Sequence, residues 1–203
     1  KAIFEYPGIE KILDQQGLSE LFGIGPAHTA GTTIFKNINE LKPAHLGIYN
    51  NSGLHIERYW KLISKPHTDN LETTCKKVKF LLNDAITRQL VSDVPLCTFL
   101  SGGLDSSIIT KFAADYCKKE KLPPLDTYSI DYVDNDKNFV KSDFQPNSDS
   151  YYINLMTKNL YTNHHSIIID TPELAKYLED AMIARDMPGM ADIDSSLLLF
   201  CKN

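Results

Sequence analysis

Apolar and polar positions alternate in long blocks along the chain after residue 95. A short, nearly continuous apolar run at 96–100 is typical of a strand buried in a parallel sheet. Further strands are predicted at 125–132 and 166–170, and apolar residues at helical spacing predict helices over 106–119 and 149–160. Strands that alternate with helices indicate a βαβαβ unit with parallel strands and right-handed crossovers. The predicted fold class is α/β, with a parallel sheet and helices on both of its faces.

The segments that flank this unit carry other signals. Apolar residues at helical spacing predict an amphipathic helix over 71–91, which Ser92-Asp93-Val94-Pro95 ends because the residue before a proline resists the helical conformation. The polar stretch 134–148 is predicted to be a mobile loop. Thr171 is predicted to cap a further helix, with Pro172 at the first helical position and an acid directly after it.

The N-terminal part of the chain has a different character. Seven of the ten glycines lie within the first 53 residues. Strands are predicted at 32–35, 46–49 and 54–59, with a hairpin turn at 50–53. We expect this part to be an irregular segment with short strands that precedes the α/β domain.

Composition and charge restrict the class of protein. The chain has 203 residues and a net charge of -5, which argues against nucleic acid or an anionic membrane as its main partner. No apolar run approaches the ~20 residues that a membrane-spanning helix needs, and no secretory signal is visible. A reducing cytoplasm is expected because the cysteines stand far apart, without metal-ligand spacing. They are Cys75, Cys97, Cys117 and Cys201.

The most informative stretch follows the first predicted strand of the sheet, where the chain runs Ser101-Gly102-Gly103-Leu104-Asp105-Ser106. Its two glycines let the backbone turn tightly and bring N–H groups against an anion. The start of the following helix adds unpaired N–H donors and the positive end of the helix dipole. The serines, together with Ser107, offer hydroxyl donors to phosphate oxygens. Asp105 beside such a cradle suggests a bridging Mg²⁺, so the stretch predicts a nucleotide phosphate site.

Other phosphate-binding loops fit this string less well. A P-loop requires a lysine that is absent after Gly103, and the dinucleotide-binding fingerprint requires a third glycine where this chain has Ser106. In a purely structural role, the two glycines would form a tight turn and Asp105 would cap the helix. The complete string between a strand and a helix favours the phosphate site.

The string resembles the signature of the ATP-pyrophosphatase, or N-type, superfamily. Its surroundings resemble the synthetase domain of glutamine-dependent asparagine synthetases, which implies an adenine nucleotide alpha hydrolase-like, Rossmann-like sheet. The similar segments before the string are 33–36, 41–43, 58–60 and 88–95, and those after it are 128–130, 164–165 and 185–189. This chain departs from the family at 43–45, where the family usually has Pro-Gly-His and this chain has Pro-Ala-His.

The resemblance implies a reaction with ATP and Mg²⁺. The β-carboxylate of aspartate would attack the α-phosphorus of ATP and release pyrophosphate, and ammonia from glutamine would then displace AMP to give asparagine. Ser101 and Asp105 would be the catalytic residues, with Asp105 also on Mg²⁺. Leu100 and Ile130 would contact the adenosine through backbone groups. Five residues would hold the departing pyrophosphate: Ser101, Gly102, Gly103, Asp105 and Ser106.

The resemblance also implies a division of the chain. Residues 1–66 would be the interdomain segment after a glutaminase domain, and 67–203 the N-terminal part of the synthetase domain, before the family's second phosphate loop. We therefore expect a fragment of a longer protein, inactive by itself and homodimeric in its full-length form. Asp186 and Asp194 would lie near the aspartate pocket, with a helix cap or a solvated carboxylate as the structural alternative.

Three other functions remain open at this point. Another adenylating N-type ligase, such as a β-lactam synthetase relative or a different amidotransferase, would act on a different carboxylic acid. A regulatory nucleotide-binding module would bind nucleotide without turnover. A protein-interaction domain that shares only the fold would bind no nucleotide.

Overall fold

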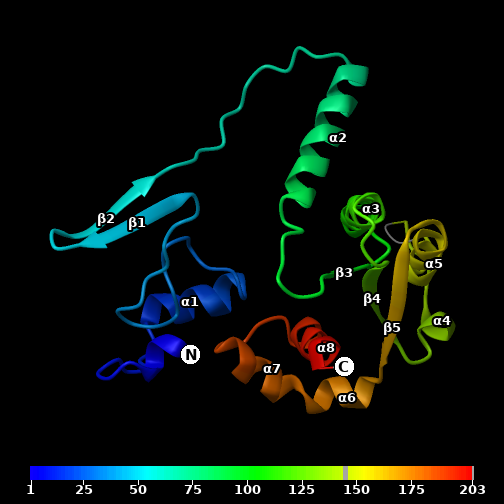
Figure 1. Ribbon diagram of the computed structural model, residues 1–203. Coiled ribbons are helices and arrows are strands. Elements are labelled where there is room, and N and C mark those ends of the chain that lie inside the picture. The colour runs from blue at the N-terminus through cyan, green and yellow to red at the C-terminus, as the bar shows by residue number, and fades with distance from the viewer. Residues whose placement is uncertain (144–145, 203) are drawn as a thin grey trace. The chain divides into compact units, whose positions relative to one another are not determined.

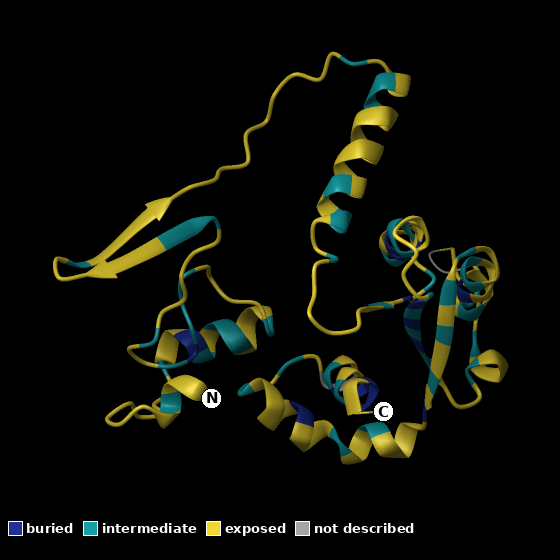
Figure 2. Cartoon of the chain, viewed as in Figure 1, coloured by how far each residue is buried: buried dark blue, intermediate teal, exposed yellow. Residues whose placement is uncertain are grey.

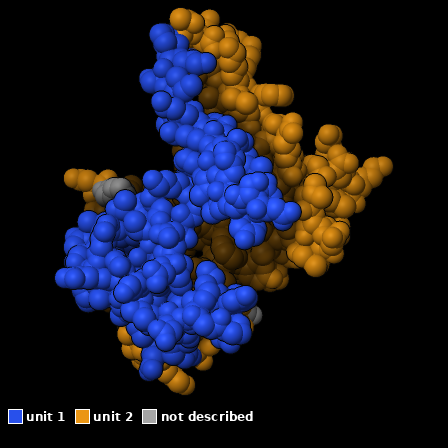
Figure 3. Space-filling view, turned by 90° about the vertical axis from the view of Figure 1, so that its left-hand side faces the viewer, with its two compact units in different colours: residues 1–67, 179–194 blue, residues 68–178, 195–203 orange. Residues whose placement is uncertain are grey.

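The computed structural model describes residues 1–143 and 146–202 (Figure 1). The chain forms two compact units, which Figure 3 colours separately. Unit 1 consists of Lys1–His67 and Glu179–Asp194, and unit 2 consists of Thr68–Leu178 and Ser195–Asn203. A segment near the end of the chain is thus part of the same unit as the N-terminal residues.

A three-stranded parallel sheet forms the centre of unit 2. Its strands are β3 (Cys97–Phe99), β4 (Leu125–Tyr132) and β5 (Thr162–Ile169), in the spatial order β3-β4-β5. The predicted parallel direction of the strands is confirmed, and β4 has the predicted bounds. Strand β5 begins four residues before the predicted 166–170, because the polar residues from Thr162 onward also pair with β4.

Helices cover both faces of this sheet, which confirms the predicted fold class. On one face, Leu125 of β4 packs against Ala113 and Ala114 of α3 (Leu104–Lys119). On the other, the Tyr128 ring lies at 80° to the ring of Phe200, in α8 (Ala191–Lys202), with 6.3 Å between centroids. Successive side chains of a strand point to opposite faces, so α3 and α8 lie on opposite sides of β4.

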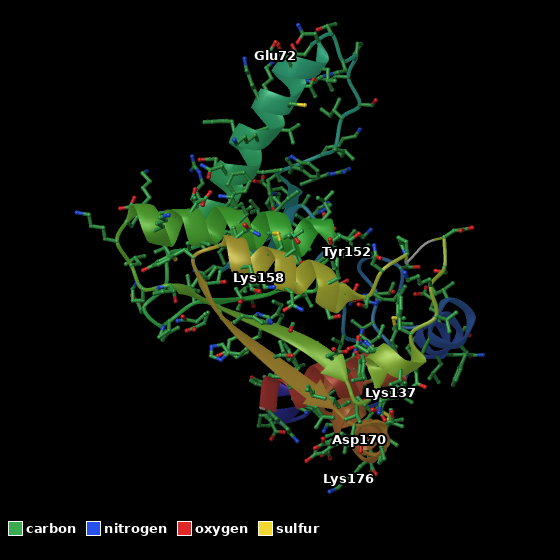
Figure 4. All side chains as sticks on the ribbon, turned by 90° about the vertical axis from the view of Figure 1, so that its right-hand side faces the viewer. Glu72, Lys137, Tyr152, Lys158, Asp170 and Lys176 are labelled. Carbon is green, nitrogen blue, oxygen red and sulfur yellow. The ribbon has the colours of Figure 1, made fainter. Side chains whose placement is uncertain are left out.

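Three helices connect or support these layers. Helix α2 (Leu71–Thr87) contacts α3 and ends before the predicted 91, since the chain turns from Arg88 onward. Helix α5 (Asp149–Asn159) follows the prediction and contacts β5; Figure 4 shows it beside α3. Helix α6 (Thr171–Lys176) has Asp170 as its N-cap, one residue before the predicted cap Thr171.

The structure corrects two further expectations in unit 2. The run 96–100 is not a buried strand: Phe99 is 54% exposed, and only Leu100 is buried, at 1%. The reason is that β3 lies at the edge of the sheet and pairs with β4 alone among the described residues. The polar stretch 134–148, expected to be a loop, contains the short helix α4 (Asn135–Asn138), and its residues 144–145 lie outside the described residues.

Unit 1 is built from short elements. They are the 3₁₀ helix η1 (Ala2–Glu5), α1 (Gln15–Ile24), the antiparallel strands β1 (His45–Asn50) and β2 (Gly53–Arg58), and α7 (Leu178–Arg185), whose first residue belongs to unit 2. The predicted hairpin is confirmed. The strand predicted at 32–35 is absent; Phe35 forms only an isolated bridge with Leu13. Figure 2 shows that both hairpin strands are largely exposed.

Among the described residues, no helix is both long and apolar enough to cross a membrane.

Candidate nucleotide site

The predicted phosphate loop connects the end of β3 to the start of α3. Before the turn, the N–H of Leu100 donates to the Tyr128 carbonyl at 2.8 Å, which holds the loop to the central strand. Gly102 then has φ of +79°, a conformation that side chains rarely adopt. Gly103 is the N-cap of α3, and the first helical N–H groups follow it. The predicted strand–turn–helix arrangement is therefore present.

Two serine hydroxyls close this loop on itself. The hydroxyls of Ser101 and Ser106 lie 3.0 Å apart, and the Ser101 N–H donates to the Ser106 hydroxyl at 3.2 Å. The Ser106 hydroxyl donates to the Gly103 carbonyl at 3.1 Å, and the Gly103 N–H donates to the Ser101 hydroxyl at 3.4 Å. These bonds fix the two ends of the turn against each other, so the loop is organised by its own side chains.

The two glycines of the loop have different surroundings. A Cβ at Gly102 would lie 2.8 Å from the Asp149 carbonyl oxygen and 3.3 Å from the Cβ of Tyr152, which Figure 4 labels on α5. A Cβ at Gly103 would meet only the Ser101 hydroxyl, at 3.4 Å. Gly102 is therefore required by packing, whereas Gly103 leaves open space beside the start of α3.

A cavity of about 270 Å³ lies beside the loop, at the carboxyl ends of β3 and β4. Three residues predicted to bind the nucleotide, Leu100, Ser101 and Ile130, line it together. Ligands of open α/β sheets bind at these strand ends. The other lining residues are Phe99, Tyr128, Ser129, Tyr132, Asp149, Leu197 and Phe200.

The sequence did not predict these other lining residues as part of the site, and three of them come from helices. Asp149 comes from the first turn of α5, and Leu197 and Phe200 come from α8. The Tyr132 hydroxyl and the buried Ser196 hydroxyl, 2.9 Å apart, tie the end of β4 to α8. The apolar run at 197–200 indicates burial, but the sequence alone does not show that its residues line this cavity.

Asp105 is exposed in the first turn of α3, next to the open side of the loop. Among the described residues, no group of three or more His, Cys, Asp or Glu side chains is placed to hold a metal ion. Mg²⁺ is commonly held by one or two carboxylates together with substrate phosphates, and it needs no cage made of protein alone. A single carboxylate in the first turn of α3, directly after the loop, fits that type of site.

A second, smaller cavity of about 140 Å³ adjoins the first, and the two share Ser129, Ile130, Tyr132 and Asp149. It also contains His164, which precedes the predicted strand 166–170 and which the structure places within β5. The two ring nitrogens of His164 lie 3.0 Å from the Thr127 hydroxyl and 3.1 Å from the Ser129 hydroxyl. Burial lowers the pKa of His164, and the neighbouring His165 lowers it further.

The two residues expected near the aspartate pocket belong to unit 1, whereas the loop belongs to unit 2. The Asp194 carboxylate pairs with the Arg185 guanidinium at 2.8 Å. Asp194 thus has a cationic partner within its own unit, and the role of Asp186 and Asp194 toward a substrate stays a prediction.

Comparisons with known proteins indicate the family of this chain. A family model described as asparagine synthase matches residues 77–203. The Bacillus subtilis asparagine synthetase [glutamine-hydrolyzing] 3 is 54% identical over 202 residues, which are 100% of this chain and 33% of that protein. Asparagine synthetase [glutamine-hydrolyzing] 2 of the same organism is 27% identical over 83% of this chain and 22% of its own length. Amidase chyE of Penicillium rubens is 30% identical over 77% of this chain and 24% of its own length. The chain spans about a third of the length of the first relative and less of the other two.

Proposed function

Because the chain belongs to the asparagine synthase family, we propose that its serine–glycine loop binds ATP and that the protein converts aspartate to asparagine. The observation that carries this proposal is the turn at Gly103, where a Cβ would meet only the Ser101 hydroxyl among the described residues, and after which the first N–H groups of α3 follow. An opening lined by N–H and O–H donors suits a phosphate group.

In the proposed complex, the nucleotide lies across the carboxyl edge of the sheet. The adenosine occupies the cavity of about 270 Å³ and contacts the backbone of Leu100 and Ile130. The Leu100 N–H already donates to Tyr128, so its carbonyl is the group that remains for the base. The β- and γ-phosphates, which leave as pyrophosphate, are held by the loop residues Ser101, Gly102, Gly103, Asp105 and Ser106.

Asp105 is the proposed Mg²⁺ ligand, and the bound ion would neutralise charge on the phosphate oxygens. Ser101 and Asp105 are the proposed catalytic residues. The Ser101 hydroxyl lies 3.0 Å from the Ser106 hydroxyl, which itself donates to the Gly103 carbonyl, so Ser101 would turn its hydrogen from Ser106 to a phosphate oxygen when the nucleotide binds. Positioning and charge stabilisation of this kind supply most of the catalysis in transfers at phosphorus.

The proposed reaction has two steps. An oxygen of the aspartate β-carboxylate forms a bond to the α-phosphorus of ATP, while the bond from that phosphorus to the bridging oxygen breaks and pyrophosphate leaves. The nitrogen of ammonia, which derives from glutamine, then attacks the activated carbonyl carbon, and AMP leaves with the former carboxylate oxygen. Adenylation is needed because a carboxylate is a poor electrophile and hydroxide is a poor leaving group.

The remaining assignments are proposals of the same kind. Residues 1–66 are proposed to be an interdomain segment and 67–203 part of a synthetase domain, with Asp186 and Asp194 serving the aspartate. A cytoplasmic location, a homodimer and the lack of a nucleic-acid partner are also proposed, and the net charge of -5 supports the last of these.

Calorimetric titration of ATP into the chain, with and without Mg²⁺, tests the nucleotide site. We expect binding that depends on Mg²⁺, that weakens at least about tenfold in Asp105→Ala, and that is lost in Gly103→Val, whose side chain fills the open space. Asp115→Ala is the matched control, because Asp115 lies further along α3 and pairs with Lys111. Equal affinity in the wild type and both loop variants would contradict the assignment.

Release of pyrophosphate from ATP, measured with the full-length protein, tests which carboxylic acid is the acceptor. Aspartate should stimulate the release, whereas glutamate, with one more methylene group, should stimulate it less. Stimulation by a different carboxylic acid and not by aspartate would point to another ligase of the N-type superfamily.

A further inference from the structure

Asp149 lies next to Gly102 of the phosphate loop. It is the first residue of α5, and its carbonyl oxygen would lie 2.8 Å from a Cβ at Gly102. Asp149 also lines both cavities at the carboxyl edge of the sheet. The packing of Gly102 therefore holds the first turn of α5 against the loop.

The wall of the larger cavity has apolar and polar parts. Its apolar walls come from the end of β3 and from α8, and include Phe99, Leu197 and Phe200. Ser101 lines this cavity and is also part of the phosphate loop. Among the residues that line this cavity, Asp149 carries the one charged side chain. The cavity thus combines an apolar wall, a carboxylate and an adjacent anion-binding loop.

We infer that Asp149 recognises the ribose of the bound nucleotide by accepting a hydrogen bond from its 2′- or 3′-hydroxyl. This inference rests on the proposed function. A purine base suits the apolar wall and the phosphates suit the loop, so the sugar that joins them lies between the two. A carboxylate in that position repels phosphate but readily accepts hydrogen bonds from neutral hydroxyl groups. Carboxylates serve the same purpose in other α/β nucleotide sites.

The exposure of Asp149 sets the size of the expected effect. Water competes with the sugar for an exposed carboxylate, so the hydrogen bond adds less than one made in a closed site. We expect the wild-type chain to prefer ATP over one of the two deoxy analogues by about tenfold.

The test is a titration of ATP, 2′-deoxy-ATP and 3′-deoxy-ATP into the wild-type chain and into Asp149→Ala, all with Mg²⁺. In Asp149→Ala the preference for ATP should fall below about twofold, while Asp149→Asn, which keeps an acceptor oxygen, should restore part of it. The ratio of affinities isolates the contact with the hydroxyl, because any general weakening of the variant affects all three nucleotides alike. Asp136→Ala is the matched control: it removes a carboxylate from the first turn of α4, outside both cavities, and should keep the wild-type preference.

Three results would overturn the inference. The first is a wild-type chain that binds ATP and both analogues equally, and the second is an Asp149→Ala variant that keeps the full preference. Either leaves the nucleotide site in place and removes only the role of Asp149. The third, no binding of ATP to the wild-type chain, would contradict the proposed nucleotide site itself, and the inference would fall with it.

Discussion

Strand β4 in unit 2 and strand β2 in unit 1 have alternating side chains but opposite surroundings. The polar residues Thr127 and Ser129 of β4 are buried, whereas the apolar residues Leu54 and Ile56 of β2 are 63% and 50% exposed. The hydroxyls of β4 can be buried because His164 provides partners for both of them. Among the described residues of unit 1, no comparable layer covers β2. Coverage by neighbouring elements, more than the apolar pattern, decides which strand forms a core.

The largest expected effect comes from truncating one leucine in each sheet. Leu125→Ala removes a side chain that is 3% exposed and packs on α3, so it should lower the free energy of unfolding by about 2–4 kcal/mol. Leu54→Ala truncates an exposed side chain and should change it by less than about 0.5 kcal/mol. Urea unfolding followed by far-UV circular dichroism measures both. Equal losses would show that β2 is covered as well as β4 is.

A smaller difference is expected between two glycines with positive φ. Gly53, in the hairpin turn, has φ of +102° and no atom within 4 Å of a Cβ, so Gly53→Ala should cost about 1 kcal/mol from backbone strain alone. Gly102→Ala adds a collision with the Asp149 carbonyl and should cost about 2–3 kcal/mol. The same unfolding measurement compares them, and titration with ATP should show weaker binding only in Gly102→Ala. If both cost the same, the packing of α5 on the loop is looser than described.

The smallest effect is a dependence of stability on pH. Burial holds the pKa of His164 below the ordinary value of 6.5, so protons bind more readily to the unfolded chain. The contribution of neutral His164 is therefore fully present above about pH 6.5 and is lost as the pH falls below it. Urea midpoints should decrease over that range in the wild type and decrease less in His164→Gln. His55→Gln, on the exposed strand β2, should keep the wild-type trend.

The sequence predicted those elements whose apolar residues recur at the spacing typical of a strand or a helix. Strand β4 and helix α5 belong to this group. The first half of β5 was missed because its residues are polar, although its backbone pairs with β4 as fully as the second half does. The run 96–100 was assigned to a buried strand because its composition suits a central position, and composition does not report that β3 lies at an edge.

The candidate site divides in a similar way. Leu100, Ser101 and Ile130 could be placed together because the carboxyl ends of neighbouring parallel strands share one edge of a sheet. Asp149 and Phe200 could not, since they come from helices that reach the cavity only through tertiary packing. Sequence spacing determines neighbours within an element, whereas neighbours between elements depend on how the helices pack.

The contact between Gly102 and α5 also limits how this loop can be reused. A designer who grafts residues 100–107 onto the strand–helix turn of another α/β protein transfers the serines, the glycines and the aspartate. The graft lacks the helix turn formed by Asp149 and Tyr152, against which Gly102 packs. Without that support, a backbone at φ of +79° is free to relax to other conformations. The smallest portable part is therefore the loop together with the first turn of α5, two pieces that lie far apart in the sequence.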